Sequence, residues 1–475
     1  MLRIRILLCA LFASLVLGVS AFAAATPAIA SHSQVTFFEA PRELLNPVTR
    51  PKTLVELQLL GVKALRVMLY WAAVAPGANS SRRPHFDAKN PASYVWGEYD
   101  ALLAEAQRLK WPVLLTVTSP VPRWATSNRR KPYLTRPNDL QFKEFMTAVG
   151  RHYGSRVSYF AIWNEPNQLG WLLPQFNSNG TPASPQIYRG LFQAGYAGLV
   201  AARVAHLKVL MGETAPFGNT SVNPRWEGLS HNVAPLAFLR GVLCLDSYYH
   251  KARGCASLPA YGYAHHAYPS SSGPLAAPFS FEDVTIGVLS RLTYALNRAA
   301  QARAIRAHMP IFLTEFGINT KPNILGVSYS QQAEDDALSE KIAYYNPRVA
   351  AFAQYEYHDD QIPRVHGSWI GFQTGLETAG GVHKPFFYGF PLPLVVSSSA
   401  GGYSLWGLVR PARGVTKVRV LVQPPHSRRF RTLKVVWTNS SGYWTLHSTT
   451  VATHWRVSWR SPSGRLYNGP SIGVT

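Results

Sequence analysis

Short apolar runs alternate with longer stretches of helical periodicity over most of the chain. Each run is long enough for one buried strand, and parallel strands that are covered on both faces are continuously hydrophobic. The runs cover residues 34–39, 62–70, 112–118, 157–163, 208–212, 261–268, 311–314 and 349–357. The stretches with helical spacing cover residues 53–60, 99–109, 140–153, 187–204, 283–306, 330–345 and 384–388, and residues 223–254 are read as a helix with a long loop.

Repeated strand–helix units predict a parallel sheet with helices outside it. Eight such units within residues 31–390 fit a closed (β/α)8 barrel of the TIM type. An open, doubly wound sheet is the alternative, but no glycine-rich phosphate loop follows an early strand. The favoured fold class is therefore α/β, with the carboxyl ends of the strands gathered at one mouth.

The pattern changes at about residue 391, where short alternating and β-branched runs replace the strand–helix units. These runs are residues 405–409, 417–422, 432–437, 443–449 and 453–459. Because turn signals separate them, they predict a small β-sandwich over residues 391–475. Its aromatic residues either stack on sugars or fill the core, and a period of two is more typical of a core.

Charge separates this second domain from the rest, because residues 391–475 hold eleven Lys and Arg and no Asp or Glu. The whole chain has a formal net charge of +23. We therefore expect the basic domain to bind an anionic cell-wall or extracellular polymer. A generally basic exported protein without such a partner is the alternative. Nucleic acid is not expected as a partner, because the chain has no nucleic-acid motif.

The first 30 residues have the parts of a secretory signal peptide. Arg3 and Arg5 form the basic start, residues 6–19 are apolar, and Ala28–Ala30 offers a small-residue cleavage site, with a cut after Ala23 as the alternative. The apolar run is shorter than the roughly 20 residues that a spanning helix needs. We expect a secreted or cell-wall-associated protein without a stable membrane span. An uncleaved anchor is the alternative.

Export changes the interpretation of the cysteines. Cys9 lies within the predicted signal peptide, which leaves Cys244 and Cys255 eleven positions apart. In an oxidising compartment this pair predicts a disulfide across a loop, with two free thiols as the alternative. Neither cysteine has a neighbour in the sequence that would activate it as a nucleophile.

Two of the apolar runs end in a glutamate. Residues 157–163 lead into Glu165 and Pro166, and residues 311–314 lead into Glu315. Proline cannot continue a sheet ladder, so Glu165 is expected at the carboxyl end of its strand, where barrel enzymes hold their catalytic groups. A pair of facing carboxyl groups, one protonated and one ionised, is what cleavage of a glycosidic bond requires.

The residues around both glutamates resemble motifs of the clan A retaining glycoside hydrolases, whose catalytic domain is a TIM barrel. Trp163–Pro166 is similar to the Asn-Glu-Pro motif of the fourth strand, and Thr314–Gly317 is similar to the motif of the seventh. The resemblance implies that Glu165 is the acid/base, that Asn164 binds the sugar 2-hydroxyl and that Glu315 is the nucleophile. Within the clan, the long loops and the added β-domain look most like the β-xylosidase and α-iduronidase type, with cellulase-like families next.

Further motifs follow in the same strand order. His266–Pro269 resembles the His-x-Tyr motif of the sixth strand, which implies that Tyr268 orients the nucleophile. Leu65–Arg66 followed by Trp71 resembles the second-strand motif of the clan, whose arginine supports the nucleophile. The resemblance implies this role for Arg66. The expected substrate-binding residues are Arg66, Trp71, Asn164, His266, Tyr268 and Tyr357.

The eighth predicted strand departs from the clan, whose members often place a tryptophan beneath the sugar there. Tyr355 and Tyr357 are the candidates in this chain, and Tyr357 is our prediction. Glu213, at the end of the fifth strand, is a third acidic candidate with a supporting role. His265 and His266 lack a third ligand at suitable spacing, so neither a metal nor an organic cofactor is expected.

Together these features predict an exported retaining glycoside hydrolase that cleaves a poly- or oligosaccharide by double displacement. Two alternatives stay open: a wall-associated carbohydrate-binding protein with an inactive barrel, and a transglycosylase. Carboxylates at both positions argue against the first alternative, whereas the sequence does not separate water from sugar as the acceptor. The identity of the sugar, its anomer, and endo or exo action stay open as well.

Overall fold

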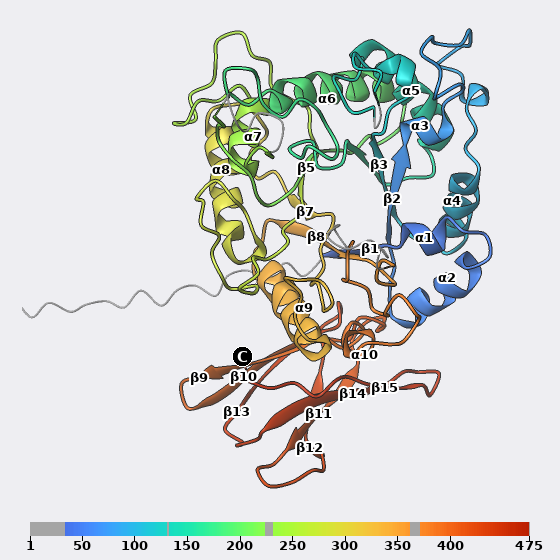
Figure 1. Cartoon of the computed structure of the whole chain (residues 1–475). Coiled ribbons are helices and arrows are strands. Elements are labelled where there is room, and N and C mark those ends of the chain that lie inside the picture. Colours follow the sequence, from blue (N-terminus) through green and yellow to red (C-terminus); the bar gives the residue numbers. More distant parts are fainter. Residues whose placement is uncertain (1–33, 131–132, 224–230, 362–370, 475) are drawn as a thin grey trace, which may run out of the picture.

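The computed structural model describes residues 34–130, 133–223, 231–361 and 371–474. The predicted signal peptide, residues 1–30, lies outside these described residues. Eight parallel strands close into a barrel in chain order, and the first strand pairs with the last (Figure 1). They are β1 (Val35–Glu39), β2 (Leu65–Tyr70), β3 (Val113–Thr118), β4 (Tyr159–Ile162), β5 (Val209–Thr214), β6 (Gly262–His265), β7 (Ile311–Leu313) and β8 (Val349–Tyr355). The predicted TIM barrel is confirmed.

Side chains alternate along each strand and therefore divide the barrel interior into layers. One layer is apolar and contains Phe37, Ala64, Leu114, Ala161, Leu210, Ala264, Phe312 and Ala351. Two positions further along the strands the buried residues turn polar: Glu39 on β1, Arg66 on β2 and Thr116 on β3. The barrel is therefore solid in its interior and carries a buried polar layer beneath its mouth.

Helices follow the strands and cover the outside of the barrel (Figure 1). They are α2 (Arg50–Leu59), α4 (Glu98–Arg108), α5 (Asp139–Tyr153), α6 (Ser184–Ala201), α7 (Pro235–Val242), α8 (Leu289–Gln301), α9 (Tyr329–Tyr344) and α10 (Pro385–Gly389). Two short helices, α1 (Pro41–Leu44) and α3 (Trp71–Val74), follow β1 and β2 directly. The longer helices bury apolar side chains such as Leu57, Leu103 and Phe145 against the strands, as amphipathic helices on a sheet do.

Several boundaries differ from the predictions, among them those of α7 and β6. The helix expected within residues 223–254 is limited to α7, and residues 224–230 lie outside the described part of the chain. The sixth strand ends at His265 rather than at residue 268, so His266 and Tyr268 lie in the loop after β6. Because such loops form the mouth of a TIM barrel, the shorter strand brings both side chains to the place where barrel enzymes react with their substrates.

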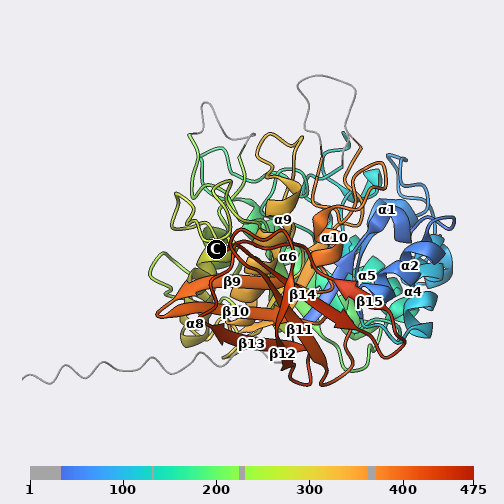
Figure 2. The ribbon, with the colours of Figure 1, turned by 90° about the horizontal axis from the view of Figure 1, so that it is seen from below.

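The carboxyl-terminal domain consists of two antiparallel sheets, as predicted, which lie below the barrel in Figure 1 and in front of it in Figure 2. One sheet has the order β13–β10–β9 and the other β12–β11–β14–β15. The strands are β9 (Leu394–Ser399), β10 (Gly402–Leu408), β11 (Lys417–Gln423), β12 (Arg431–Trp437), β13 (Tyr443–Ser448), β14 (His454–Arg460) and β15 (Leu466–Asn468). Trp406, Trp444, Trp455 and Trp459 are buried, whereas Trp437 is 61% exposed. Most of the tryptophans therefore fill the core.

The two domains meet along α9, next to which the sandwich lies in Figure 1. Arg410 donates to both carboxylate oxygens of Glu340 on α9, at 3.0 and 2.7 Å, and to the hydroxyl of Thr36 at 2.9 Å. Beside this buried ion pair, the rings of Tyr344 and Tyr443 pack with centroids 4.3 Å apart. Charge and aromatic packing together attach the sandwich to the barrel.

A disulfide joins Cys244 and Cys255 and closes the loop after α7. This loop is also attached to α8, because Arg298 donates to the carbonyl oxygen of Tyr248 at 2.9 Å. Among the described residues, no helix is both long and apolar enough to cross a membrane.

Candidate active site

A pocket of about 620 Å³ opens at the carboxyl ends of the barrel strands. Its lining combines carboxylates, among them Glu165 and Glu315, with flat aromatic rings. The aromatic lining residues are Tyr70, Trp171, Phe217, Tyr268, Tyr355 and Phe372. Rings around a small number of polar groups are typical of a binding site for an organic ligand, and a sugar presents both apolar faces and hydroxyl groups.

Glu165 reaches the pocket from an unusual stretch of backbone. Trp163 and Glu165 have φ angles of 70° and 37°, in the left-handed region that residues other than glycine seldom adopt. These residues follow the end of β4, and such conformations concentrate at functional sites. The Glu165 carboxylate accepts a hydrogen bond from the indole Nε1 of Trp171 at 3.1 Å and lies 2.9 Å from Nδ1 of His266.

Glu315, which follows β7, is held through both of its carboxylate oxygens. Tyr268 donates to Oε1 at 2.7 Å, and Arg66 donates to Oε2 at 2.8 Å. Nδ1 of His266 lies 3.6 Å from the same Oε2 atom. A carboxylate with two hydrogen-bond donors and a histidine nitrogen nearby is fixed in position and favoured in its ionised form.

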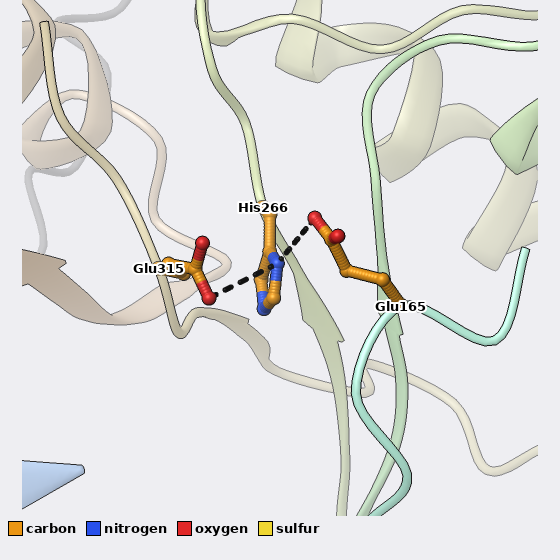
Figure 3. A group of neighbouring side chains, drawn as sticks. All are labelled: Glu165, His266 and Glu315. Carbon is orange, nitrogen blue, oxygen red and sulfur yellow. Dashed lines mark hydrogen bonds and ion pairs between the residues drawn. The ribbon is translucent and has the colours of Figure 1, made fainter. Parts of the chain in front are cut away.

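His266 lies between the two glutamates, as Figure 3 shows. One oxygen of Glu165, one oxygen of Glu315 and the histidine nitrogen all lie within 4.8 Å of one another. Two buried carboxyl groups this close repel each other when both are ionised. The arrangement therefore favours a state in which one carboxyl holds a proton and the histidine ring is positively charged.

The two carboxyl groups have pKa values displaced in opposite directions. Burial raises the pKa of Glu165 and the charge of Glu315 adds to it, against the hydrogen bond and charge of His266. Burial acts in the same direction on Glu315, but the charges of His266 and Arg66 and the hydrogen bond from Tyr268 outweigh it. They hold the pKa of Glu315 below its ordinary value. One group is thus disposed to keep its proton and the other to lose it.

The two neighbouring histidines differ in charge because their surroundings differ. Burial lowers the pKa of His265 to about 3. Its Nε2 donates to the carbonyl of Val284 at 2.8 Å, so its Nδ1 accepts from the hydroxyl of Thr214 at 2.9 Å. Burial also disfavours a charge on His266, but the two adjacent carboxylates outweigh it and raise its pKa. His265 is a neutral structural residue, whereas the surroundings of His266 favour a positive charge on its ring.

Arg66 occupies the centre of the polar layer and is fully buried. Its guanidinium donates to Asn164 at 2.5 Å, to Glu213 at 2.7 Å, to Glu315 at 2.8 Å and also to Glu39. Burial, with the charges of Glu315 and Glu213, raises the pKa of Glu39 to about 7 despite the arginine. One cation is thus shared among three carboxyl groups, as the supporting role expected for Glu213 requires.

Four of the six predicted substrate-binding residues lie at the site, and they fall into two groups. Asn164 and Tyr268 line the pocket, where their polar atoms can meet a ligand. Arg66 and His266 are buried behind the carboxylates and contact these groups instead of the open pocket. Arg66 and His266 therefore hold the carboxyl groups in position and shift their pKa values.

Two predicted substrate contacts are wrong. Trp71 is fully buried, because α3 starts directly after β2 and directs the ring against α5, where it stacks on Phe145 with centroids 5.2 Å apart. Tyr357 is 2% exposed, and its hydroxyl contacts Glu56 and Glu377 outside the pocket. Since β8 ends two residues earlier, the alternation of side chains along that strand does not extend to Tyr357.

Other aromatic residues take these places. Tyr355, the last residue of β8, lines the pocket, and Tyr70 stacks on Trp171 with centroids 6.5 Å apart. Tyr70 and Glu39 are the last residues of two predicted strands. Functional groups of barrel enzymes lie at the carboxyl ends of strands, and this rule, which identified Glu165, also applied to them. Trp171 lies in a loop, where the sequence has no periodic signal. The structure identifies it as a site residue through its hydrogen bond to Glu165.

Glu165, His266 and Glu315 are the one cluster of three potential metal ligands among the described residues. Their ligand atoms already face one another in hydrogen bonds or ion pairs. Arg66, 2.8 Å from Glu315, would also repel a divalent cation there. The cluster fits an acid–base site and fits a metal poorly.

No protein-family model matches the chain, and no curated protein matches it either. A solved family 39 glycoside hydrolase from the gut symbiont Bacteroides cellulosilyticus WH2 matches with a TM-score of 0.52, covering 88% of this chain and 79% of its own, at 14% identity. A glucosidase from Croceicoccus marinus matches with a TM-score of 0.52, covering 90% and 96%, at 12% identity. This chain shares their fold. At such low identity the likeness concerns the fold, and function has to be argued from the pocket.

Proposed function

We propose that the protein is a retaining glycoside hydrolase, with Glu165 as the acid/base and Glu315 as the nucleophile. The observation that carries the proposal is the short separation of the two carboxyl groups, which bring one oxygen each within 4.8 Å of the other. Retaining enzymes hold these groups about 5–5.5 Å apart, whereas inverting enzymes need roughly 6.5–9.5 Å to admit a water molecule.

In the first step, the ionised Glu315 attacks the anomeric carbon while Glu165 gives its proton to the leaving oxygen. The bond between the sugar and Glu315 forms as the glycosidic bond breaks, which yields a covalent ester. In the second step, Glu165 takes a proton from water, the resulting nucleophile attacks the same carbon, and Glu315 leaves as a carboxylate. The raised pKa of Glu165 and the lowered pKa of Glu315 match the protonation states that the first step needs.

The neighbouring groups divide the remaining tasks. Tyr268 and Arg66 hold the Glu315 carboxylate by hydrogen bonds at 2.7 and 2.8 Å, so it need not reorganise before it attacks. Arg66 also donates to Oδ1 of Asn164, which leaves the amide N–H groups for a sugar hydroxyl. His266 stabilises whichever of the two glutamates is ionised as the proton moves.

The sugar at the point of cleavage is expected to be uncharged or to carry an amino group. Among the described residues, the pocket lining includes neither Lys nor Arg, whereas Glu39 and Asp335 line it beside the catalytic pair. A sugar carboxylate or sulfate would meet negative charge without a compensating cation. The aromatic walls suit a neutral sugar face.

We place the enzyme outside the cell, on an envelope or extracellular polysaccharide. The amino-terminal signal pattern, the net charge of +23 and the disulfide in the barrel support this location. The sandwich is proposed to retain the enzyme on an anionic polymer through the outer face of its four-stranded sheet. There Trp437 is exposed, Lys417 lies 4.9 Å from its ring and Arg419 is exposed nearby.

The retaining mechanism is tested by following the product anomer by proton NMR during hydrolysis of aryl glycosides. We expect the first-formed sugar to keep the anomeric configuration of the substrate. Glu165→Ala should lose activity and regain it with added azide as a glycosyl azide, whereas Asp335→Asn, a change in the same pocket, should stay active. An inverted product would contradict the proposal. Binding of oligosaccharides without any turnover would favour the inactive carbohydrate-binding protein, and transfer to added sugars would favour the transglycosylase.

A further inference from the structure

A second cleft lies on the outer side of the barrel, between α7, α8 and the disulfide-closed loop of residues 244–255. Its volume is about 840 Å³, within the range of small-molecule sites. No described residue lines both this cleft and the catalytic pocket. In Figure 1, α7 and α8 lie on the side of the barrel opposite α2 and α4, and the sandwich lies below.

Three arginines converge on this cleft, and within its described lining they meet a single carboxylate. Arg240 forms an ion pair with Glu282 at 2.8 Å. Arg291 and Arg298 donate to neutral oxygens, namely backbone carbonyl groups and the hydroxyl of Tyr294. Two guanidinium charges are therefore left without a carboxylate in the cleft wall, and guanidinium groups pair well with carboxylates and sulfates.

Large aromatic rings border the same cleft and are open to water. Tyr248, Phe281 and Tyr294 line it with exposed fractions of 73%, 83% and 55%. Isolated exposed rings are common, but several rings in one cleft beside cations that form no ion pair in its described lining are typical of a recognition surface. Rings of this kind pack on the apolar faces of sugars.

The groups of the cleft are held in place before any ligand arrives. The Arg291 guanidinium lies 5.0 Å from the centre of the Phe281 ring, and that of Arg298 lies 5.9 Å from the Tyr294 ring. The disulfide closes the loop of residues 244–255 on the other side of the cleft. Because these contacts already exist, little side-chain ordering opposes binding.

We propose that this cleft is a second carbohydrate site, which binds an anionic stretch of a glycan. Its acid groups would contact Arg291 and Arg298, and its sugar faces would pack on Phe281 and Tyr294. The binding itself does not depend on the proposed hydrolase activity. If that activity holds, the two sites select different chemistry: the cleft retains acidic parts of a polymer, and the catalytic pocket receives a sugar without negative charge.

The test is isothermal titration calorimetry of the full chain with tetragalacturonate, a sulfated tetrasaccharide and neutral cellotetraose. We expect at least one anionic ligand to bind, with an affinity that falls as salt is added, and cellotetraose to bind at the cleft at least about tenfold more weakly. The comparison of the carboxylated and sulfated ligands identifies the preferred anion. Phe281→Ala and Arg298→Gln should each weaken anionic binding about tenfold, which corresponds to about 1.4 kcal/mol.

Phe279→Ala is the matched control, because Phe279 is fully exposed, two positions from Phe281, and does not line the cleft. It should bind like the unmodified protein, and so should Glu315→Gln, which separates this site from catalysis. Equal weakening of neutral and anionic binding by the cleft variants would overturn the proposal, and so would unchanged affinity for the anionic ligands in both variants or the absence of anionic binding. Loss of binding in Trp437→Ala, with the cleft variants unaffected, would assign the glycan to the sandwich instead.

Discussion

The Tyr268→Phe substitution removes a single hydroxyl that holds the Glu315 carboxylate. This hydroxyl donates to Glu315 at 2.7 Å, and the ring packs beside Phe316 and Phe372 with centroids 6.1 and 5.8 Å away. Phenylalanine keeps that packing, so the hydrogen bond is the main loss. A hydrogen bond to a charged group is worth about 1.5–3 kcal/mol, and about 1.4 kcal/mol corresponds to one pH unit.

The direction of the effect follows from the charge. A donor favours the ionised carboxylate, so its removal favours the protonated form and raises the pKa of Glu315. Hydrolysis needs Glu315 ionised, so the acidic limb of the pH–rate profile should move to higher pH by about one to two units. The alkaline limb, which reports the protonated Glu165, should stay near its original position.

The assay is kcat/KM of an aryl glycoside over about pH 3–9, because this ratio reports the free enzyme. Tyr355→Phe is the control, since it removes a hydroxyl from the same pocket that has no hydrogen bond to Glu315. An acidic limb that stays in place in Tyr268→Phe, or one that moves equally in the control, would refute the assignment of Glu315 as the nucleophile.

Three further substitutions test other parts of the account. Trp171→Phe removes the indole donor 3.1 Å from Glu165, so the pKa of Glu165 should rise. The alkaline limb of the pH–rate profile should then move to higher pH by about one unit, and an unmoved limb would contradict a role of this hydrogen bond. Arg410→Met leaves Glu340 buried without its cation and should lower the free energy of unfolding in urea by about 3–5 kcal/mol, whereas a loss below about 1 kcal/mol would show that the interface does not need the ion pair. Trp71→Ala should cost about 3–5 kcal/mol of stability through a core cavity and leave KM unchanged, and a raised KM at unchanged stability would restore its predicted substrate contact.

The barrel could be predicted because its strands are buried on both faces and therefore stand out as continuous apolar runs. The same signal located Glu165 and Glu315, since Glu315 directly follows one such run and Glu165 lies two positions after the end of another. The contacts between them could not be predicted from local pattern. Arg66 and Glu315 are 249 positions apart and meet because the sheet closes into a barrel.

The errors have local causes. Trp71 follows a strand in the sequence, but a helix starts at once and directs the ring into the core. Trp171 belongs to a loop, and loops carry no periodicity from which the direction of a side chain can be read. The second cleft could be predicted only in part. Arg291, Tyr294 and Arg298 share one face of α8 at helical spacing, which a sequence pattern can indicate, whereas Phe281 comes from a loop without such a pattern.

The central claim is that Glu315 forms a covalent bond to the sugar, and a 2-deoxy-2-fluoro glycosyl donor tests it most directly. Such donors form the glycosyl-enzyme faster than water removes the sugar, so the ester accumulates. Intact-protein mass spectrometry should show the addition of one sugar, and peptide mapping should place it on Glu315. Glu315→Gln should not be labelled, whereas Asp335→Asn should be. Labelling of a different carboxylate, or hydrolysis of the donor panel with inversion and without any labelled protein, would contradict the account.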